Sequence, residues 1–431
     1  MTATTRGLLA LALGLTVGAA LAAWRPDLYG GLLPFARAVG RLWLDALRMA
    51  IMPLLFVLLV DGVGKGLGVE QRPPLRQALI AGGLLVLAAL AGAALTMAML
   101  RIWPAPARAG LAFAQALQGV GAPPAPLVGT AWFEGLIPAN PFRAAADGAV
   151  GPWIVFSLAF GLAAARLPEG PRATLAGVVE AAAKSLMIIV GWVLWLAPLG
   201  VAMLGLILGG ELGAQALGPL AHYILINGLL NLILIGLVYL AIMLTAGPGV
   251  ATFARAAAPA QMVALSTQSS LVALPAMLQA GVALGVSPRG RNLILPLAVT
   301  LFRVGSAASI VAIALYIAHL AGVRPSLPAI TGAVLLSALI SVGAVGLPSQ
   351  VSYVAALSPV CLVLGAPLEA LMLLMTVDVA ADAVRTVANV TADIALASRL
   401  DRTRQTAQQG DGFGAIGDGL ALRASGEDVG Q

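Results

Sequence analysis

The stretch TVDVAADAVRTVANVTAD, from Thr376 to Asp393, carries the side chains around which this chain is organised. Its polar residues are separated by four, three, four and four positions: Asp378, Asp382, Arg385, Asn389 and Asp393. At about 100° per residue, these positions fall on one helical stripe roughly 80° wide. The stretch therefore predicts a helix with one polar stripe among apolar faces.

The composition predicts an all-α polytopic membrane protein. Of the 431 residues, 60% are hydrophobic and only 10% are charged, whereas a soluble protein carries about 25% charged residues. In such a chain a polar stripe is expected to point at a site inside the membrane. A charge ladder between two helices is the alternative, but three acids on this stripe share one arginine.

Metal and enzyme chemistry find little support in the sequence. The one cysteine, Cys361, excludes an intramolecular disulfide, and the two histidines, His222 and His319, cannot build a metal site by themselves. We expect no enzyme activity, no metal site, no cofactor and no nucleic-acid partner. The net charge of +6 is expected in loops and tails, where it orients the chain in the bilayer.

Apolar runs predict several membrane-spanning helices before residue 250. They are expected at 7–24, about 39–66, 77–103, a span ending near 165, 176–208 and 217–246. Basic loops and a basic segment near 400 fall on the side of the N-terminus in this count. The positive-inside rule then makes both termini cytoplasmic, in a plasma or inner membrane.

Two later stretches do not fit ordinary spans. Residues 253–286 have the polar run Ser266–Ser270 in their middle, and residues 327–364 have the Gly- and Pro-containing run Gly343–Gln350. Each is predicted to be a re-entrant helical hairpin, and such paired interruptions indicate a transporter binding site. Two kinked full spans are the alternative.

These features together resemble the glutamate transporter family, also described as dicarboxylate/amino acid:cation symporters. The resemblance rests on Leu136–Phe142 (LIPANPF), Ser269-Ser270, Gly346–Pro348 and the spacing of the Thr376–Asp393 stretch. It implies eight transmembrane helices, two opposed hairpins, inverted repeats, a homotrimer and elevator-type alternating access.

The resemblance also implies a division of the chain. The expected parts are scaffold helices one and two at 1–76, transport-domain helix three at 77–103, scaffold helices four and five at 104–208, a transport domain at 209–400 with both hairpins, and a disordered cytoplasmic tail at 401–431.

By resemblance, the stripe holds an amino acid substrate. Asp382 matches the residue that binds the ammonium, Arg385 the one that binds the side-chain carboxylate, and Thr386 and Asn389 match groups around the main-chain carboxylate and amine. Further substrate contacts are implied on the hairpins and the seventh helix: Gln268, Ser270, Ser306 and Leu347.

The chemistry of the pair agrees with this assignment. A guanidinium binds a carboxylate bidentately, and Asp382 beside it would attract an ammonium but repel a plain dicarboxylate. We therefore expect a transporter of aspartate or glutamate. A transporter of C4-dicarboxylates or other organic anions with the same fold is the first alternative. An anion channel or sensor that has lost coupled transport is the second.

The chain departs from its relatives where they bind sodium. The family's Asn-Met-Asp on the seventh helix is replaced by Phe302, Arg303 and Val304, and its third-helix ligands align with Leu84-Leu85 and Ala88-Ala89. Sodium requires several oxygen ligands, which these apolar side chains lack. Gln268 also replaces the family's arginine at the first hairpin tip.

We therefore expect Arg303 to act as a tethered cation near Asp393, unless its side chain extends to a polar boundary. Transport would then be driven by protons or by exchange rather than by sodium. Asp378, Asp382 and Asp393 are all candidates for the proton carrier.

Overall fold

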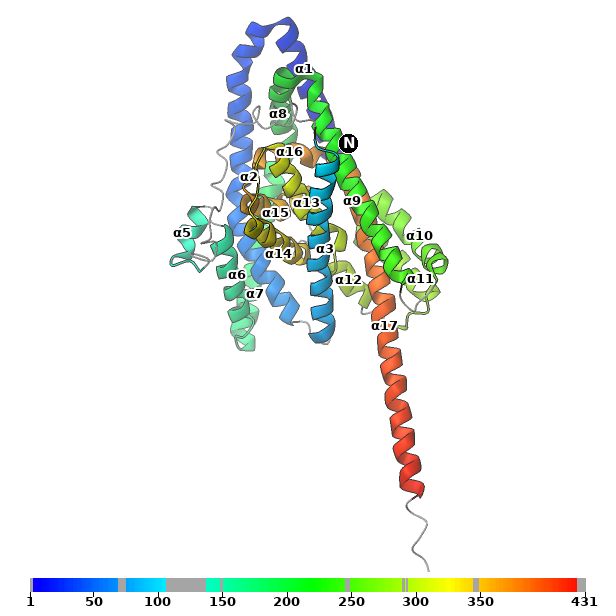
Figure 1. The fold of residues 1–431 in the computed structure, drawn as a ribbon. Helices are drawn as coiled ribbons and strands as arrows, with labels where there is room; N and C mark the ends of the chain where they lie inside the picture. Colours follow the sequence, from blue (N-terminus) through cyan, green and yellow to red (C-terminus); the bar gives the residue numbers. More distant parts are fainter. Residues whose placement is uncertain are drawn as a thin grey trace, which may run out of the picture.

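The computed structural model describes residues 3–68, 75–105, 137–147, 150–244, 249–288, 291, 294–343 and 349–424. Within these ranges all regular structure is helical, and there is no strand. Figure 1 shows long helices lying roughly side by side, with shorter helices packed among them.

The first half of the chain forms long helices with short connecting elements. They are α1 (Ala3–Trp24), α2 (Pro26–Gly68), α3 (Leu75–Ile102), α5 (Pro141–Ala146), α6 (Val150–Ala164), α7 (Glu169–Trp195), α8 (Ala197–Leu212) and the 3-10 helix η1 (Gly213–Ala216).

The second half contains two long helices, α9 and α17, with shorter helices arranged in pairs between them. They are α9 (Leu217–Met243), α10 (Val250–Thr267), α11 (Ser270–Ala283), α12 (Leu295–Leu301), α13 (Val304–Leu320), α14 (Leu327–Gly343), α15 (Ser349–Leu364), α16 (Leu368–Val377) and α17 (Val379–Ala424).

Several of these helices can cross a bilayer, which makes this a multi-pass membrane protein. Among the described residues, five stretches are long and apolar enough: Arg6–Trp24, Leu79–Ile102, Glu169–Val193, Leu217–Met243 and Leu295–Leu320. The first four overlap spans expected from the sequence, and the fifth contains the residues that the resemblance assigned to the seventh helix. The last one is interrupted by the break between α12 and α13.

Glycines bring α1 and α8 into very close contact. A Cβ on Gly18 would lie 2.1 Å from the carbonyl oxygen of Leu206, and one on Gly209 would lie 2.1 Å from that of Leu15. Small residues allow backbones to approach in this way, and close packing is a main source of helix association in lipid.

The expected long helix at 176–208 is instead two helices. α7 ends at Trp195 and α8 starts at Ala197, with Pro198 in its first turn. Proline has no N–H for the preceding turn and favours the start of a helix. The sequence prediction missed this break, although Pro53 inside α2 is accommodated without one.

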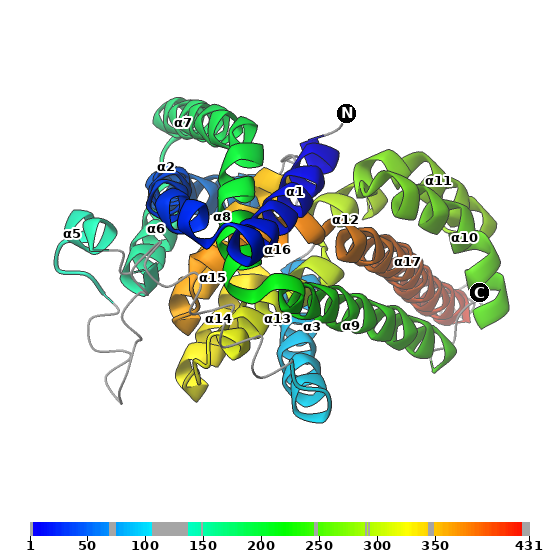
Figure 2. The ribbon, with the colours of Figure 1, turned by 90° about the horizontal axis from the view of Figure 1, so that it is seen from above.

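The two stretches expected to be hairpins each contain a packed helix pair. α10 and α11 lie side by side (Figure 2), joined at Gln268, whose φ of 54° is the one positive value at a non-glycine residue in the described part. Ser269 begins α11 by accepting a hydrogen bond from the N–H of Val272 at 3.4 Å. α14 and α15 also pack together, but residues 344–348 between them lie outside the described residues.

Two further pairs are single helices with a break. α12 and α13 are separated by Phe302 and Arg303, whose backbone is not helical, with φ and ψ of −108° and 77° and of −106° and 70°. α16 and α17 meet at Asp378. The two breaks belong to neighbouring helices, because α13 packs against α17.

The C-terminal part of α17 differs from the expectation. A disordered tail was expected from residue 401, but α17 continues to Ala424 and projects beyond the other helices (Figure 1). Residues 401–424 contain no proline, but their five glycines are poor helix formers, so helical propensity alone does not explain this extension.

Candidate functional site

The polar stripe of the C-terminal helix survives the break at Asp378. The N–H of Asp382 donates to the carbonyl oxygen of Asp378 at 2.7 Å, so the helical hydrogen-bond pattern continues across the junction of α16 and α17. Asp378 is buried, with 4% of its surface exposed. Asp378 therefore stays on the same helix face as the polar residues of α17, as the spacing in the sequence predicts.

Arg385 is held by two carboxylates of this stripe. Its Nη2 donates to both oxygens of Asp378 at 2.8 Å, and its Nη1 donates to Oδ1 of Asp382 at 3.1 Å. The side chain of Asp378 is 6% exposed and that of Asp382 is 21% exposed. The Asp382 contact is the more accessible of the two and the easier one for a ligand to replace.

Asn389 joins α17 to α13 through Ser306. Its Oδ1 accepts a hydrogen bond from the backbone N–H of Ser306 at 3.2 Å, and its Nδ2 donates to Oγ of Ser306 at 3.1 Å. Ser306 lies in the first turn of α13, where a backbone N–H has no partner within the helix. Two residues that the sequence assigned to one site are thus in direct contact.

In the described part of the chain, the other residues expected to contact the substrate make no side-chain hydrogen bond with Arg385 or Asn389. Thr386 donates its hydroxyl to the carbonyl oxygen of Asp382 at 2.8 Å, so only its lone pairs remain for a ligand. Gln268, at the hairpin tip, donates from Nε2 to the carbonyl oxygen of Val379 at 3.3 Å. Ser270 begins α11 and is half-buried. Leu347 lies outside the described residues.

Arg303 lies opposite the same stripe, at the break between α12 and α13. Its charge is attracted by Asp382 and by Asp393, more strongly by Asp382, and it is repelled by that of Arg385. Asp393 is 1% exposed, and within the described part of the chain neither of its carboxylate oxygens has a hydrogen-bond partner. Arg303 therefore acts on Asp393 through space rather than by a direct hydrogen bond.

Comparison with known proteins places the chain in a family. The model of the sodium:dicarboxylate symporter family matches residues 4–403. The chain belongs to this family. This confirms the resemblance seen in the sequence. It also agrees with the expectation that the protein is not an enzyme, since the family consists of transporters.

Individual relatives are similar to this chain over about half of their own length. Excitatory amino acid transporter 4 of Mus musculus is 29% identical over 255 residues, 56% of this chain and 43% of the relative. The proton/glutamate-aspartate symporter of Escherichia coli (strain K12) is 30% identical over 256 residues, 59% and 58%. The serine/threonine transporter SstT of Bifidobacterium adolescentis is 29% identical over 214 residues, 49% and 48%.

The side chains that the sequence analysis aligned with the family's sodium ligands are apolar in this chain. The break between α12 and α13 presents Phe302 and Val304, and α3 presents Ala88 and Ala89, both buried. None of these side chains carries an oxygen ligand for a hard cation. The guanidinium of Arg303 would in addition repel a cation at Asp393.

Sequence reasoning missed two tyrosines that extend the hydrogen-bond network of the polar stripe. Tyr223 of α9 donates its hydroxyl to Oδ1 of Asp378, and its oxygen lies 3.1 Å from the hydroxyl of Tyr353 on α15. Both rings are buried. A buried tyrosine usually has a hydrogen-bond partner, which was the available signal, but the sequence does not say which partner.

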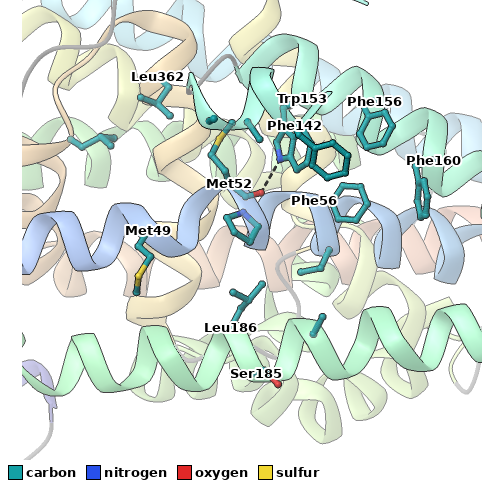
Figure 3. Close-up of a pocket in the computed structure, with 16 residues that line it drawn as sticks. Met49, Met52, Phe56, Phe142, Trp153, Phe156, Phe160, Ser185, Leu186 and Leu362 are labelled. Carbon is teal, nitrogen blue, oxygen red and sulfur yellow. Dashed lines mark hydrogen bonds between the residues drawn. The ribbon is translucent and has the colours of Figure 1, made fainter. Parts of the chain in front are cut away.

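A large cavity lies elsewhere in the described structure and is mostly apolar. It has a volume of about 1200 Å³ and lies between α2, α5, α6 and α7, with Leu362 of α15 and Leu368 of α16 at its edge. Figure 3 shows aromatic rings along it, among them Phe56, Trp153 and Phe156. No residue of the polar stripe lines it.

Proposed function

We propose that this protein is a secondary transporter of acidic amino acids that is not coupled to sodium. The observation that carries the proposal is the grouping of Arg385 with Asp378 and Asp382 on one buried stripe beside a broken helix. A guanidinium and a more exposed carboxylate side by side complement a ligand that has both a carboxylate and an ammonium.

Binding would exchange one contact of Arg385 for another. The side-chain carboxylate of the substrate would displace Asp382 from Nη1, while Asp378 keeps Nη2. The freed carboxylate of Asp382 would then receive the substrate ammonium. Because each new contact replaces the one that is broken, neither Arg385 nor Asp382 is left unpaired, which would be costly at this depth.

The remaining polar groups would hold the main-chain end of the substrate. Thr386 lies one turn after Asp382 and Asn389 one turn after Arg385 on α17, and Ser306 lies against Asn389. Ser270 and the backbone at Gln268 and Leu347 would close the site from the hairpin tips. These assignments rest on the resemblance and on the contacts among Asn389, Ser306 and α17.

Coupling to protons follows from the charges around the site. The three acids of the stripe face two cations, Arg385 and Arg303, which leaves one negative charge without compensation. Asp378 and Asp382 both bind Arg385, but Asp393 has no hydrogen bond within the described ranges. A buried carboxylate without a partner is costly unless it takes up a proton, so we propose Asp393 as the proton carrier.

The architecture is proposed from the family. Eight spanning helices and two re-entrant hairpins would form a homotrimer in the plasma or inner membrane, with both termini cytoplasmic. A scaffold made of α1, α2 and α5 to α8 would carry a moving transport domain made of α3 and α9 to α17, by an elevator mechanism. Figure 2 is compatible with this division, since α2, α6 and α7 lie on one side and α9 to α11 with α17 on the other.

Uptake into liposomes containing the purified protein tests the proposal. We expect uptake of labelled aspartate or glutamate that responds to a pH gradient and is unchanged when choline replaces sodium. Succinate, malate and serine should compete weakly. A steep dependence on a sodium gradient without any response to pH would overturn the coupling, and stronger competition by succinate would overturn the substrate class.

A further inference from the structure

A chain of three hydrogen-bonded side chains connects the second hairpin pair to the substrate arginine. Tyr353 lies on α15, Tyr223 on α9, and Asp378 at the break between α16 and α17. Asp378 in turn holds Nη2 of Arg385 with both of its oxygens. Helix α9 and the three consecutive helices α15, α16 and α17 therefore meet along a single polar line.

The direction of these hydrogen bonds follows from the number of protons. Tyr223 has one hydroxyl proton and gives it to Asp378. The contact between the two hydroxyls can then form only if Tyr353 donates to the oxygen of Tyr223. Hydrogen bonds aligned in this way polarise one another, so the loss of one end weakens the other.

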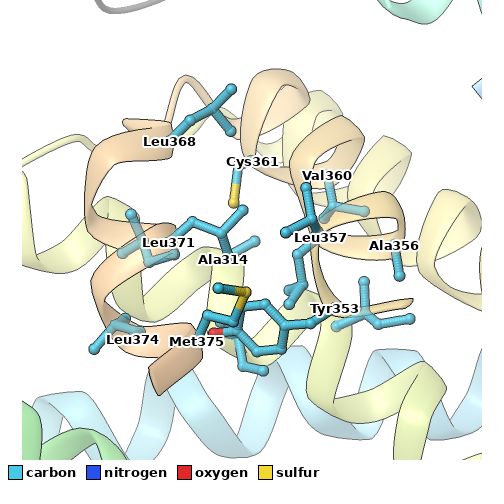
Figure 4. Close-up of a cluster of buried hydrophobic side chains, with 14 of the residues drawn as sticks. Ala314, Tyr353, Ala356, Leu357, Val360, Cys361, Leu368, Leu371, Leu374 and Met375 are labelled. Carbon is cyan, nitrogen blue, oxygen red and sulfur yellow. The ribbon is translucent and has the colours of Figure 1, made fainter. Parts of the chain in front are cut away.

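The environment of Tyr353 makes this line structurally important. Figure 4 shows Tyr353 in an apolar cluster with Leu357 and Cys361 of α15 and with Leu371 and Met375 of α16. In this cluster the Tyr223 hydroxyl is the hydrogen-bond partner of the Tyr353 hydroxyl. Leaving a buried hydroxyl without a partner costs free energy, so Tyr353 favours the position of α15 in which it reaches Tyr223.

We propose that Tyr223 and Tyr353 form a latch that fixes α15 to Asp378 and keeps Asp378 on Arg385. The two tyrosines are positioning residues, since they act on the substrate through Asp378. Movement of α15 away from α9 would break the Tyr353 contact first and weaken the hold of Asp378 on Arg385. The state of the second hairpin would in this way set how firmly Arg385 is oriented for a substrate carboxylate.

The latch can be tested without a substrate, because Cys361 lies on the same helix arm. It is the one cysteine of the chain, it is fully buried, and it follows Tyr353 by about two helical turns. The rate at which N-ethylmaleimide modifies Cys361 in the purified full-length protein, measured by intact mass, reports opening of α15. Tyr353→Phe keeps the ring and removes only the hydroxyl.

We expect Tyr353→Phe and Tyr223→Phe to raise the Cys361 modification rate by about tenfold, the change in an opening equilibrium expected for the loss of one buried hydrogen bond. Tyr239→Phe is the matched control, because Tyr239 lies on α9 and its hydroxyl bonds Gln261 instead. The control should keep the wild-type rate. Equal rates in all four proteins would overturn the latch.

Transport kinetics supply a second readout, which rests on the proposed function. Both latch variants should raise KM for aspartate by about five- to tenfold and change the maximal rate less, with Tyr223→Phe the more severe because it touches Asp378. A lower maximal rate with unchanged KM would overturn the positioning role. Faster Cys361 modification without transport of any acidic amino acid would support the latch and refute the proposed substrate.

Discussion

Gly305 of α13 lies directly against the backbone of Arg385 on α17. A Cβ at Gly305 would be 2.8 Å from the carbonyl oxygen of Arg385 and 3.0 Å from the Cβ of Ala388. The position of the substrate arginine is therefore set by backbone packing as well as by its ion pairs. The neighbouring Arg303 and Ser306 are brought to the stripe by the same close approach.

We expect Gly305→Ala to displace α13 from α17. Overpacking of this kind costs about 1–3 kcal/mol, so the detergent-purified variant should unfold at a lower temperature and bind aspartate more weakly. Gly236→Ala on α9 is the control, since nothing lies within 4 Å of a Cβ there. If Gly305→Ala keeps wild-type stability and aspartate affinity, the close packing of α13 on α17 does not set the position of Arg385.

The sequence predicted the stripe well because its information is local. A four-three-four-four spacing on a helix decides which side chains share a face, and Arg385 does lie between Asp378 and Asp382. The family resemblance was needed to add Ser306, which is 83 positions from Asn389. Apolar periodicity likewise located α1, α3 and α9 to within a few residues.

The latch tyrosines could not be predicted in the same way. Tyr223 and Tyr353 are 130 positions apart, and the polar residues at helical spacing from them, such as Asn227 and Gln350, do not indicate that the two pair. Their pairing depends on how α9, α15 and α16 pack, which is a tertiary property. The break at Leu196, in contrast, had a local signal in Pro198. The sequence prediction missed it because Pro198 lies within a long apolar run.

Asn389 should be less replaceable than its partner Ser306. Asn389→Ala leaves the buried N–H of Ser306 without an acceptor, at a cost of about 1–3 kcal/mol, or roughly ten- to hundredfold in affinity. Ser306→Ala keeps that hydrogen bond and should weaken aspartate binding less. Binding measured by calorimetry for both variants and the double variant checks this, and additive losses would argue against direct coupling of the pair.

Asp393→Asn should separate exchange from proton-driven uptake. Asparagine has a similar shape but cannot carry a proton, and Asp393 makes no hydrogen bond in the described structure that the change would break. We expect counterflow of labelled aspartate to persist within about threefold, while uptake driven by a pH gradient falls by more than about tenfold. If pH-driven uptake is retained, Asp393 is not the proton carrier and the role passes to Asp378 or Asp382. Asp378→Asn and Asp382→Asn are then the next variants to measure.

Arg303→Gln should weaken the binding of an anionic substrate. Three carboxylates would then face Arg385 alone, because the charge that attracts Asp382 and Asp393 is lost. We expect KM for aspartate to rise by more than about tenfold, and Arg303→Lys to preserve a larger part of the affinity.

The exposed Arg255 of α10 provides the control for this charge change, and Arg255→Gln should bind aspartate normally. Added sodium should not rescue Arg303→Gln, because Phe302 and Val304 offer no side-chain oxygen. Uptake assays in sodium and in choline distinguish the outcomes. Normal affinity in Arg303→Gln would refute the tethered cation, since a guanidinium that balances two buried carboxylates cannot be removed without changing the charge that the substrate meets.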